Sequence, residues 1–360
     1  MRAVGIILAG GNNNRMKELT HKRAVAAMPI AGSYRSIDFA LSNMTNSHIQ
    51  KVAVLTQYNA RSLNEHLNSS KWWDFGRKQG GLYVFTPTIT NDNGYWYRGT
   101  ADAIYQNMDF LKKSHEPYVV IASGDAVYKM DYSKVLQYHI DKKADVTVVC
   151  KEMDPSDDVS RFGTIRMDDD MRITEFEEKP MVTKSNMIST GIYVIRRRLL
   201  IDLIEHAAEE ERFDFVNDVL IRYKNLKRIY GYKIDSYWSN IASVESYYKT
   251  NMDFLKKEVR DYFFREYPDV HSKVDDNPPA KYNPGCQVKN SLIANGSIIN
   301  GYVENSVIFK KVFVGENCVI KNSIVLNDVY LGDNVYLENC IVESRDTIRA
   351  NTRYVGEKDI

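Results

Sequence analysis

The chain has 360 residues, of which 44% are hydrophobic and 26% are charged, and its formal net charge at pH 7 is +1. These values are typical of a globular protein with two domains, and they exclude the strongly basic surface of a nucleic-acid-binding protein. No apolar run approaches the roughly 20 residues that a membrane span requires, so we expect a cytoplasmic protein with neither a membrane nor a nucleic-acid partner. The four cysteines form no CxxC pair and predict free, buried thiols.

The first predicted element is a buried parallel strand, Val4–Ala9, which is followed at once by Gly10 and Gly11. Glycines after a strand let the backbone turn tightly and approach a large anion. A helix predicted to begin near Arg15 or Met16 would direct its N–H groups to the same place. We interpret this loop as a nucleotide-phosphate cradle, although a strand-to-helix turn uses glycine even where nothing binds. Its spacing matches neither a Rossmann dinucleotide fingerprint nor a P-loop.

Strands and helices then alternate. Further buried strands are predicted at 52–56, 118–123 and 146–150, with helices at 101–113 and 132–142 between them. This alternation predicts an α/β fold, a Rossmann-like domain with a mixed, mainly parallel sheet covered on both faces. Ligands of such sheets bind beyond the carboxyl ends of the strands. The glycine loop, the Gln57-Tyr58 corner and the Ser123-Gly-Asp125 corner are therefore expected to meet in one pocket.

The pattern changes at residues 161–195. Short alternating stretches at 161–165, 172–177 and 192–195 predict antiparallel ribbons that flank the main sheet. Helices are predicted at 201–211 and 218–223, a strand at 230–234, and one long amphipathic helix at 244–259. Residues 266–285 are rich in proline and polar residues and are interpreted as a linker, which gives a first domain at 1–265.

Beyond the linker, apolar residues recur every six positions. The two series are Val312, Cys318, Ile324, Tyr330 and Tyr336, and Ile308, Val314, Ile320 and Leu326. A six-residue period predicts a left-handed parallel β-helix at 286–360, in which each step forms one flat side of a triangular coil. Irregular strands of a small sandwich would not keep this register. The unpaired edges of the coil predict contact with another subunit.

Several motifs carry a resemblance to one family. They are Leu19-Thr-His-Lys-Arg-Ala24, Tyr34-Arg-Ser-Ile-Asp-Phe-Ala-Leu-Ser-Asn43, Trp96-Tyr-Arg-Gly-Thr-Ala-Asp-Ala103, Ser123-Gly-Asp125, Phe176-Glu-Glu-Lys-Pro180 and Ser189-Thr-Gly-Ile-Tyr193. In these motifs and in their order, the chain resembles bacterial glucose-1-phosphate adenylyltransferase (ADP-glucose pyrophosphorylase) from residue 1 to its end. The resemblance implies a nucleotidyltransferase domain, a C-terminal β-helix used for tetramer contacts, and the reaction of ATP with glucose 1-phosphate to give ADP-glucose and diphosphate.

The implied reaction passes through a transition state crowded with negative charge, so catalysis depends on charge neutralisation and alignment. Relatives use Mg²⁺, which bridges phosphate oxygens and is held by one or two carboxylates. Asp125 matches the principal metal-binding aspartate of the family, although a turn-capping aspartate would explain the same residue.

The resemblance also implies binding positions. The nucleotide positions are Gly10, Gly11, Arg15, Gly99 and Thr100. The sugar-phosphate positions are Tyr97, Gly163, Glu178, Lys179 and Ser189. Lys179 would pair with the phosphate as a point charge, whereas the sequence alone favours a solvated pair of Glu178 and Lys179. Lys22, Arg23 and Arg35 resemble a basic cluster that binds phosphorylated effectors in relatives, and ordinary surface ion pairs are an equal alternative.

Four departures from the family pattern fall among these positions. Asn240 stands where relatives carry the aspartate that completes the metal site, and Val25 stands where they carry a lysine that neutralises phosphate charge. Asn12, Asn13 and Asn14 replace the end of a Gly-Gly-x-Gly-x-Arg loop, and Phe215-Val-Asn-Asp218 lacks a Gly-Lys pair. Mg²⁺ is therefore expected to bind weakly or not at all.

These departures predict a regulatory, catalytically deficient subunit of the family, of the GlgD type. Such a subunit would assemble with a separate catalytic subunit in a hetero-oligomer, expected to be a tetramer, and act in glycogen synthesis. Two alternatives remain open. One is an active adenylyltransferase with an atypical metal site, and the other is a homo-oligomeric sugar-phosphate sensor.

Overall fold

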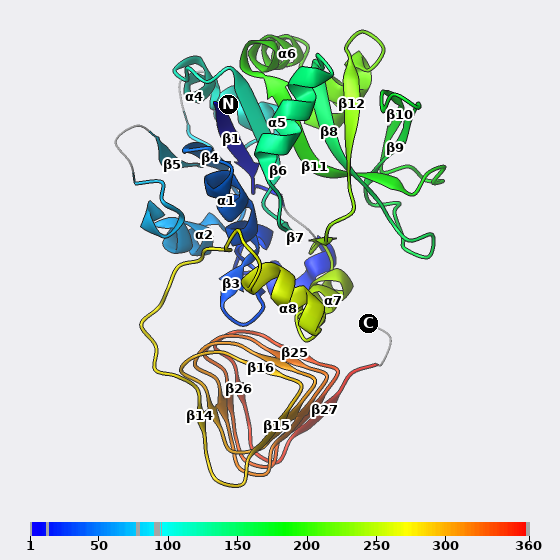
Figure 1. Cartoon of the computed structure of the whole chain (residues 1–360). Coiled ribbons are helices and arrows are strands. Elements are labelled where there is room, and N and C mark those ends of the chain that lie inside the picture. The colour runs from blue at the N-terminus through cyan, green and yellow to red at the C-terminus, as the bar shows by residue number, and fades with distance from the viewer. Residues whose placement is uncertain (1, 12–13, 77–79, 90–93, 95, 358–360) are drawn as a thin grey trace.

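The computed structural model describes residues 2–11, 14–76, 80–89, 94 and 96–357. Figure 1 shows an α/β domain formed by the first part of the chain and, below it, a three-sided coil formed by the last part. The predicted fold class, a mainly parallel α/β sheet followed by a left-handed parallel β-helix, is confirmed.

A sheet of nine strands runs through the described part of the α/β domain. Its members are β1 (Ala3–Leu8), β4 (Lys51–Leu55), β5 (Gly81–Phe85), β6 (Tyr118–Ser123), β8 (Val146–Glu152), β9 (Gly163–Met167), β10 (Ile173–Glu178), β11 (Met187–Arg196) and β12 (Ile229–Ile234). β1 pairs in parallel with β4 and β6, β4 with β5, and β12 with β8. β11 is antiparallel to both β6 and β8 and joins the two parallel groups.

The place of β11 differs from the prediction. A short ribbon strand is predicted at 192–195, flanking the sheet, but the strand has ten residues and lies within the sheet between β6 and β8. Its pairing shifts register between Ser189 and Tyr193, where Gly191 has a φ of +75°. This irregularity divides the buried run, so its two halves do not read as one strand. The antiparallel ribbon of β9 and β10 is confirmed.

Helices cover both faces of the sheet. They are α1 (Ser36–Asn46), α2 (Ala60–Leu67), α3 (Thr100–Gln106), α4 (Met108–Lys112), α5 (Tyr132–Asp141), α6 (Arg197–Glu209), α7 (Val244–Asp253) and α8 (Lys257–Phe264). The chain also forms the 3₁₀ segments η1 (Asn14–Thr20), η2 (Val25–Ala27) and η3 (Ser70–Trp73) and the π-helical segment η4 (Phe215–Ile221). Residues of α1, α2 and α5 pack on one face, and residues of α3, α4 and α6 pack on the other. Ile6 and Ile7 of β1 belong to opposite cores, which explains its uninterrupted apolar run.

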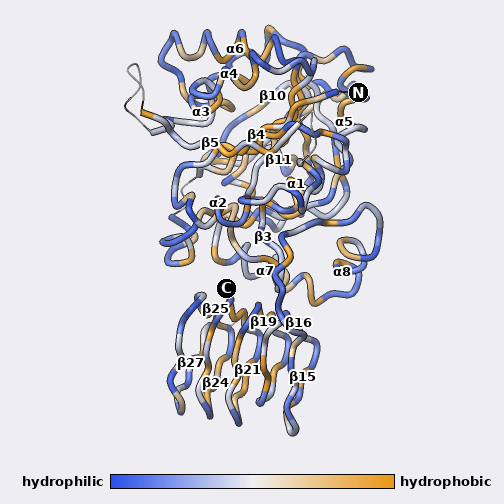
Figure 2. The backbone as a smooth tube through the Cα atoms, turned by 90° about the vertical axis from the view of Figure 1, so that its left-hand side faces the viewer, coloured by the Kyte–Doolittle hydropathy of each residue, from blue (hydrophilic) through white to orange (hydrophobic). Residues whose placement is uncertain are grey.

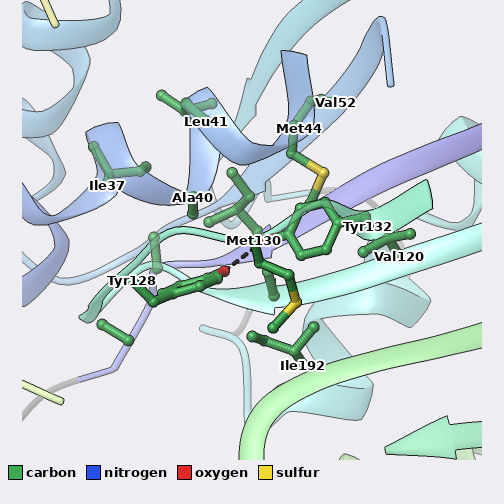
Figure 3. Packing of buried hydrophobic residues seen from close by; sticks show 14 of the residues in the cluster. Ile37, Ala40, Leu41, Met44, Val52, Val120, Tyr128, Met130, Tyr132 and Ile192 are labelled. Atoms are coloured by element: carbon green, nitrogen blue, oxygen red, sulfur yellow. Dashed lines mark hydrogen bonds between the residues drawn. The ribbon is translucent and has the colours of Figure 1, made fainter. Parts of the chain in front are cut away.

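The core beneath α1 contains two tyrosines whose polar ends satisfy each other. The hydroxyl groups of Tyr128 and Tyr132 lie 2.6 Å apart among the apolar side chains that Figure 3 shows. Figure 2 shows that the hydrophobic segments of the chain concentrate in the strands, with hydrophilic segments on the outer helices. Each helix in the described part of the chain is too short or too polar to cross a bilayer.

Two long helices of the prediction are each broken into two. The stretch 101–113 divides into α3 and α4 at Asn107, whose side chain donates to the carbonyl of Ala103 at 2.8 Å and so competes with the helix backbone. The stretch 244–259 divides into α7 and α8. There, Arg260 Nη1 donates to the carbonyls of Phe254 and Leu255, at 2.9 and 2.6 Å, and satisfies the end of α7.

Two other predicted helices take unusual forms. The helix expected near Arg15 is the 3₁₀ segment η1, which is interrupted at Lys17. The stretch 218–223 overlaps η4, which is a π-helix.

The coil has three sides, each built from short parallel strands stacked along its axis. The first side holds β14 (Lys281–Tyr282), β17 (Ile298–Ile299), β20 (Phe313–Val314), β23 (Tyr330–Leu331) and β26 (Thr347–Ile348). The second holds β15 (Gln287–Lys289), β18 (Tyr302–Glu304), β21 (Val319–Lys321), β24 (Tyr336–Glu338) and β27 (Arg353–Val355). The third holds β16 (Leu292–Ile293), β19 (Val307–Ile308), β22 (Ile324–Val325) and β25 (Ile341–Val342). Since β14 already pairs with β17, the coil begins inside the predicted linker 266–285.

The six-residue period holds only in part. The series from Ile308 to Leu326 is fully buried, but in the other series Tyr330 is 50% exposed and Tyr336 is partly exposed. Phe313 pairs with Tyr330 and Tyr330 with Thr347, 17 residues apart in both cases. One side of such a coil is therefore a residue shorter than six, and a strict six-residue series drifts out of the interior.

The third side of the coil packs against the α/β domain. Val307, Phe309 and Ile324 belong to one buried cluster with Phe254 and Phe263. In addition, Tyr248 of α7 donates a hydrogen bond from its hydroxyl to the carbonyl of Asn322 at 2.6 Å. A small two-stranded sheet of β2 (Pro29–Ile30) and β3 (Tyr34–Arg35) lies on the α/β side of this junction. A second two-stranded sheet consists of β7 (Ala126–Tyr128) and β13 (Trp238–Asn240), and it lies at the candidate functional site described below.

Candidate functional site

A cavity of about 1040 Å³ opens beyond the carboxyl ends of the central strands. Gly10 and Gly11 follow β1, Gln57 follows β4, and Ser123 and Asp125 follow β6, and all of them line this main cavity. The prediction that these three corners meet in one pocket is confirmed.

The residues predicted to bind the nucleotide all line the main cavity. They are Gly10, Gly11, Arg15, Gly99 and Thr100. A Cβ atom at Gly99 would lie 2.3 Å from the carbonyl oxygen of Phe213, whereas a Cβ atom at Gly11 would meet nothing within 4 Å. Gly99 is thus required by packing, and Gly11 leaves open space. Asn12 and Asn13 lie outside the described residues, and Asn14 begins η1.

The carboxylate end of the cavity is built by β7 and β13. Asn240 pairs with Ala126 across this small sheet, and its Nδ2 lies 3.4 Å from the backbone oxygen of Asp125. The side-chain oxygen of Asn240 accepts a hydrogen bond from the N–H of Ala242 at 2.9 Å. Asp125 Oδ1 accepts from the hydroxyl of Ser123 at 2.5 Å. Asn240 Oδ1 and Asp125 Oδ1, which are candidate metal ligands, therefore each already accept a hydrogen bond within the chain.

This end of the cavity offers Mg²⁺ one carboxylate where the family pattern has two. Magnesium requires near-octahedral oxygen ligands and in proteins is held by one or two carboxylates together with substrate phosphates. Asp125 is the only acidic residue among the described residues that line the cavity. No group of three His, Cys, Asp or Glu side chains that would hold a metal occurs in the part of the chain that the structure describes. In the family the ion supplies positive charge to the phosphates, and this donor set offers it only one carboxylate.

Positive side chains outnumber the single carboxylate. Arg15, Arg98, Arg161 and Lys179 all line the cavity. The guanidinium of Arg98 lies 3.8 Å from the ring centre of Phe213 and 3.3 Å from a carboxylate oxygen of Asp102. Val25, in η2, also lines the cavity but is almost fully buried, at 6% exposure, and adds no charge. Because Arg98 is already paired with Asp102, the cations that give the cavity lining an excess of positive charge over Asp125 are Arg15, Arg161 and Lys179. This excess favours a negatively charged ligand.

Arg98 and Arg161 are not among the binding residues predicted from the sequence. Arg98 lies inside the Trp96–Ala103 motif, which is a signal that would find it. Arg161 stands at the start of the predicted strand 161–165, and without the tertiary structure an arginine at this position does not indicate a binding role.

The residues predicted to bind the sugar phosphate divide into two groups. Tyr97 and Lys179 line the main cavity, whereas Gly163, Glu178 and Ser189 lie outside its lining. The N–H of Tyr97 donates to Gln57 Oε1 at 2.9 Å, and burial raises the pKa of the Tyr97 hydroxyl.

The second group lies beside the cavity, at the ends of β9, β10 and β11. Gly163 pairs with Glu178, and a Cβ atom at Gly163 would lie 2.8 Å from Glu178 Oε2. Burial raises the pKa of the Glu178 carboxyl, and Lys179 lies 3.5 Å from it. The Ser189 hydroxyl lies 3.2 Å from that of Tyr193, which does line the cavity. The binding roles of these residues stay predictions.

The three residues predicted to bind an effector do not line one cavity, and their binding role stays a prediction. Arg35 lines a second cavity of about 210 Å³, between the α/β domain and the coil, together with Lys273, Lys310 and Lys311. Arg23 forms an ion pair with Glu343 of the coil, which is the alternative left open by the sequence. Lys22 is exposed and lines neither cavity.

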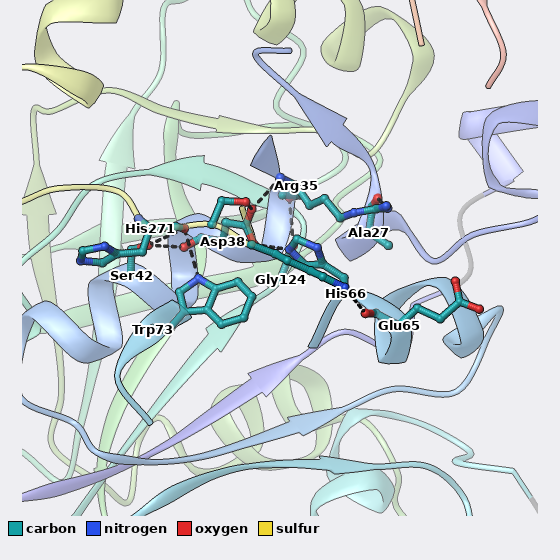
Figure 4. Close-up of polar contacts among 12 residues, drawn as sticks. Ala27, Arg35, Asp38, Ser42, Glu65, His66, Trp73, Gly124 and His271 are labelled. Carbon is teal, nitrogen blue, oxygen red and sulfur yellow. Dashed lines mark hydrogen bonds and ion pairs between the residues drawn. The ribbon is translucent and has the colours of Figure 1, made fainter. Parts of the chain in front are cut away.

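A buried carboxylate, Asp38 at the start of α1, forms hydrogen bonds with residues that line the second cavity. Its oxygens accept from the N–H of Arg35 at 2.8 Å and from the hydroxyl of Ser272 at 2.5 Å. The Nε2 atom of His66, which lines the second cavity, lies 2.6 Å from the other oxygen of Asp38. Figure 4 shows this network, with Trp73 and His271 beside it. Its geometry indicates a structural role.

Comparison with known proteins places the two parts of the chain. Residues 4–257 match the family described as Nucleotidyl transferase, and residues 278–359 match the family described as GlmU-like, C-terminal hexapeptide. A protein of Clostridium novyi named Glucose-1-phosphate adenylyltransferase is 40% identical over 321 residues, which cover 88% of this chain and 84% of that protein. Proteins with the same name from Pseudothermotoga lettingae and Thermosipho melanesiensis are 39% and 40% identical. The matched regions cover 89% and 88% of this chain, and 76% and 77% of those proteins.

Proposed function

Because this chain belongs to the glucose-1-phosphate adenylyltransferase family of nucleotidyltransferases, we propose that it is a regulatory, catalytically deficient subunit, of the GlgD type. In this role it assembles with a catalytic subunit that joins ATP and glucose 1-phosphate to ADP-glucose and diphosphate, and it modulates glycogen synthesis in the cytoplasm. The expected assembly is a hetero-tetramer.

One observation carries the proposal. Val25 and Asn240, which stand where the family pattern has a lysine and an aspartate, line the same cavity as Asp125. Two charged groups are thus replaced in one site rather than at scattered surface positions. Since phosphoryl and nucleotidyl transfer depend on neutralising charge that develops on phosphate oxygens, a site without these groups has lost a large part of its catalytic power.

The charge that remains supports binding more than catalysis. Arg15, Arg161 and Lys179 favour a phosphate-bearing ligand, and the open space beside Gly11 leaves room for one. A subunit that binds such a ligand without converting it has a means of sensing it. Binding at this site then affects a catalytic partner by favouring one conformation of the assembly.

The test is an activity assay of the isolated chain with ATP, glucose 1-phosphate and Mg²⁺. We expect ADP-glucose formation at least about a thousandfold slower than that of a catalytic family member, a barrier difference of about 4 kcal/mol. Turnover comparable to that of such a member would contradict the proposal. Co-expression with a catalytic paralogue should yield a mixed complex, and consistent absence of that complex would favour a homo-oligomeric sugar-phosphate sensor.

A second candidate function is an active adenylyltransferase with an atypical metal site. It is favoured by the relatives at about 40% identity, which are named for that activity. The same assay separates the two candidates, because only the active enzyme forms ADP-glucose when no partner is present.

A further inference from the structure

Arg161, which lies just before β9, has a buried donor without a partner. Its side chain lines the main cavity, and its Nη1 donates to the hydroxyl of Ser243 at 3.3 Å. The Nε atom is buried and makes no hydrogen bond within the part of the chain that the structure describes. Leaving a buried donor without a hydrogen bond is costly, and more so on a charged group, so native structures rarely keep one without a reason.

No carboxylate neutralises this guanidinium directly. Among the described residues, no acidic oxygen lies within 4 Å of Arg161, although Asp157, Asp158 and Glu245 are near enough to raise its pKa. Burial and the charge of Arg15 lower that pKa, and burial is the largest of these influences. Because an arginine stays protonated at neutral pH, the cavity holds a partly buried positive charge.

The position of Arg161 connects it to the carboxylate end of the cavity. Ser243, its hydrogen-bond partner, follows Asn240 by three residues and caps the N-terminus of α7. Ala242, next to Ser243, lines the cavity together with Asn240 and Asp125. The cation is therefore anchored to the segment that carries the altered metal position, where the described lining offers Mg²⁺ one carboxylate.

We propose that the main cavity binds the polyphosphate chain of a nucleotide without a divalent cation, and that Arg161 is a ligand of the phosphate oxygens. This inference rests on the proposed function, since a subunit that need not catalyse transfer has no need of the metal. The Nε–H and the second Nη of Arg161 then form charge-assisted hydrogen bonds to the anion. Arg15 lines the same cavity and adds a second positive charge.

A polyphosphate is the anion that matches this charge. It carries several negative charges, and Arg15 and Arg161 line the same cavity, whose described lining holds one carboxylate, Asp125. Lys179, which follows β10, is instead predicted to pair with the single phosphate of glucose 1-phosphate. Inorganic pyrophosphate isolates the polyphosphate part of the interaction and is therefore the probe.

The experiment measures pyrophosphate binding by isothermal titration calorimetry at fixed ionic strength, in EDTA and in Mg²⁺. The full chain is compared with Arg161→Gln, Arg161→Lys and a matched control, Arg166→Gln. Arg166 is a half-exposed arginine on β9 that lies 3.7 Å from Glu175 and is outside both cavities.

We expect the unmodified chain to bind pyrophosphate in EDTA, with an affinity that Mg²⁺ changes by less than about threefold. Arg161→Gln should weaken binding at least about tenfold, which corresponds to about 1.4 kcal/mol. Arg161→Lys should be intermediate because it keeps the charge but loses the Nε–H. Arg166→Gln should leave the affinity unchanged, and ATP should compete with pyrophosphate.

Three results would overturn the inference. They are pyrophosphate binding that appears only with Mg²⁺, Arg161→Gln that binds as tightly as the unmodified chain, and Arg166→Gln that weakens binding as much as Arg161→Gln. The first comparison uses the unmodified chain, so it remains decisive if a variant does not fold. Catalytic turnover by the isolated chain would contradict the proposed regulatory role but would leave metal-free binding through Arg161 standing, so the two failures are distinguishable.

Discussion

Arg23 of the α/β domain and Glu343 of the β-helix form an ion pair across the junction between the two domains. Their side chains are only 12% and 32% exposed, so solvent screens this pair less than it screens a surface pair. The Arg23 side chain is one of those that the sequence assigns to an effector. Its ion pair indicates that it also holds the β-helix in place.

This pair predicts a measurable coupling between the domains. In a double-mutant cycle with Arg23→Ala and Glu343→Gln, the coupling free energy of unfolding should be about 1 kcal/mol, because a half-buried pair exceeds a fully exposed one. Denaturant unfolding of the three variants and the unmodified chain gives the value. Lys22→Ala, at the exposed neighbouring position, serves as the control and should change stability by less than about 0.5 kcal/mol. A coupling indistinguishable from zero would show that apolar packing alone holds the junction.

Gly99→Ala should destabilise the protein. A Cβ atom at this position would lie 2.3 Å from the carbonyl oxygen of Phe213, and backbone must move to relieve the overlap. Overpacking of this kind costs about 1–3 kcal/mol, and we expect a corresponding fall in Tm. Gly11→Ala is the matched control from the same cavity, since its Cβ atom would meet nothing within 4 Å. Equal losses of Tm in the two variants would argue against steric overlap as the cause.

Much of the α/β sheet is predictable from the sequence. The strand β6 has the predicted bounds, Tyr118–Ser123, because a strand buried on both faces leaves an apolar run with sharp ends. The convergence of the glycine loop with Asp125 is predictable for a topological reason, since parallel strands end at the same edge of a sheet. The position of β11 is not predictable in the same way. Its pairing with β6 and β8 is antiparallel and depends on contacts between distant segments.

The site follows the same division. Residues next to strand ends, such as Gly10 and Asp125, are predictable from sequence, whereas Arg161 enters the cavity only because β9 docks beside β11 and Ser243 fixes its guanidinium. The β-helix drifts from a strict six-residue period because its coils are shorter than three steps of six residues. Phe313 and Tyr330 pair 17 residues apart, and Ile298 and Phe313 pair 15 residues apart. A search for a fixed period does not detect such shortened coils.

His139 should make stability depend on pH. It is 1% exposed, its Nδ1 lies 2.8 Å from the Thr147 hydroxyl, and burial lowers its pKa from 6.5 to about 4. Between these two pH values the unfolded chain binds a proton that the folded chain does not. The free energy of unfolding therefore has its full value above pH 6.5 and falls as the pH decreases towards 4. The contribution of His139 amounts to a loss of about 2 kcal/mol between pH 7 and pH 5.

Denaturant unfolding of His139→Gln at these two pH values checks this expectation. The variant should lose less stability on acidification than the unmodified chain, by about 2 kcal/mol. His115→Gln, which replaces an exposed histidine, should retain the full pH dependence. If His139→Gln and the unmodified chain show the same slope, the acid sensitivity arises from other groups.

The proposed catalytic deficiency predicts that returning the two charges of the family pattern raises activity. Asn240→Asp supplies a second carboxylate beside Asp125, and Val25→Lys returns a cation to the wall of the same cavity. Together they should raise ADP-glucose formation by the isolated chain at least about tenfold and make ATP binding depend on Mg²⁺. The added carboxylate would help to hold the cation, and the added lysine would neutralise charge that develops on the phosphates. Val25→Ala, which removes bulk without adding charge, is the control and should give no gain. A double variant that folds but binds Mg²⁺ no better than the unmodified chain would mean that these two positions do not account for the proposed deficiency.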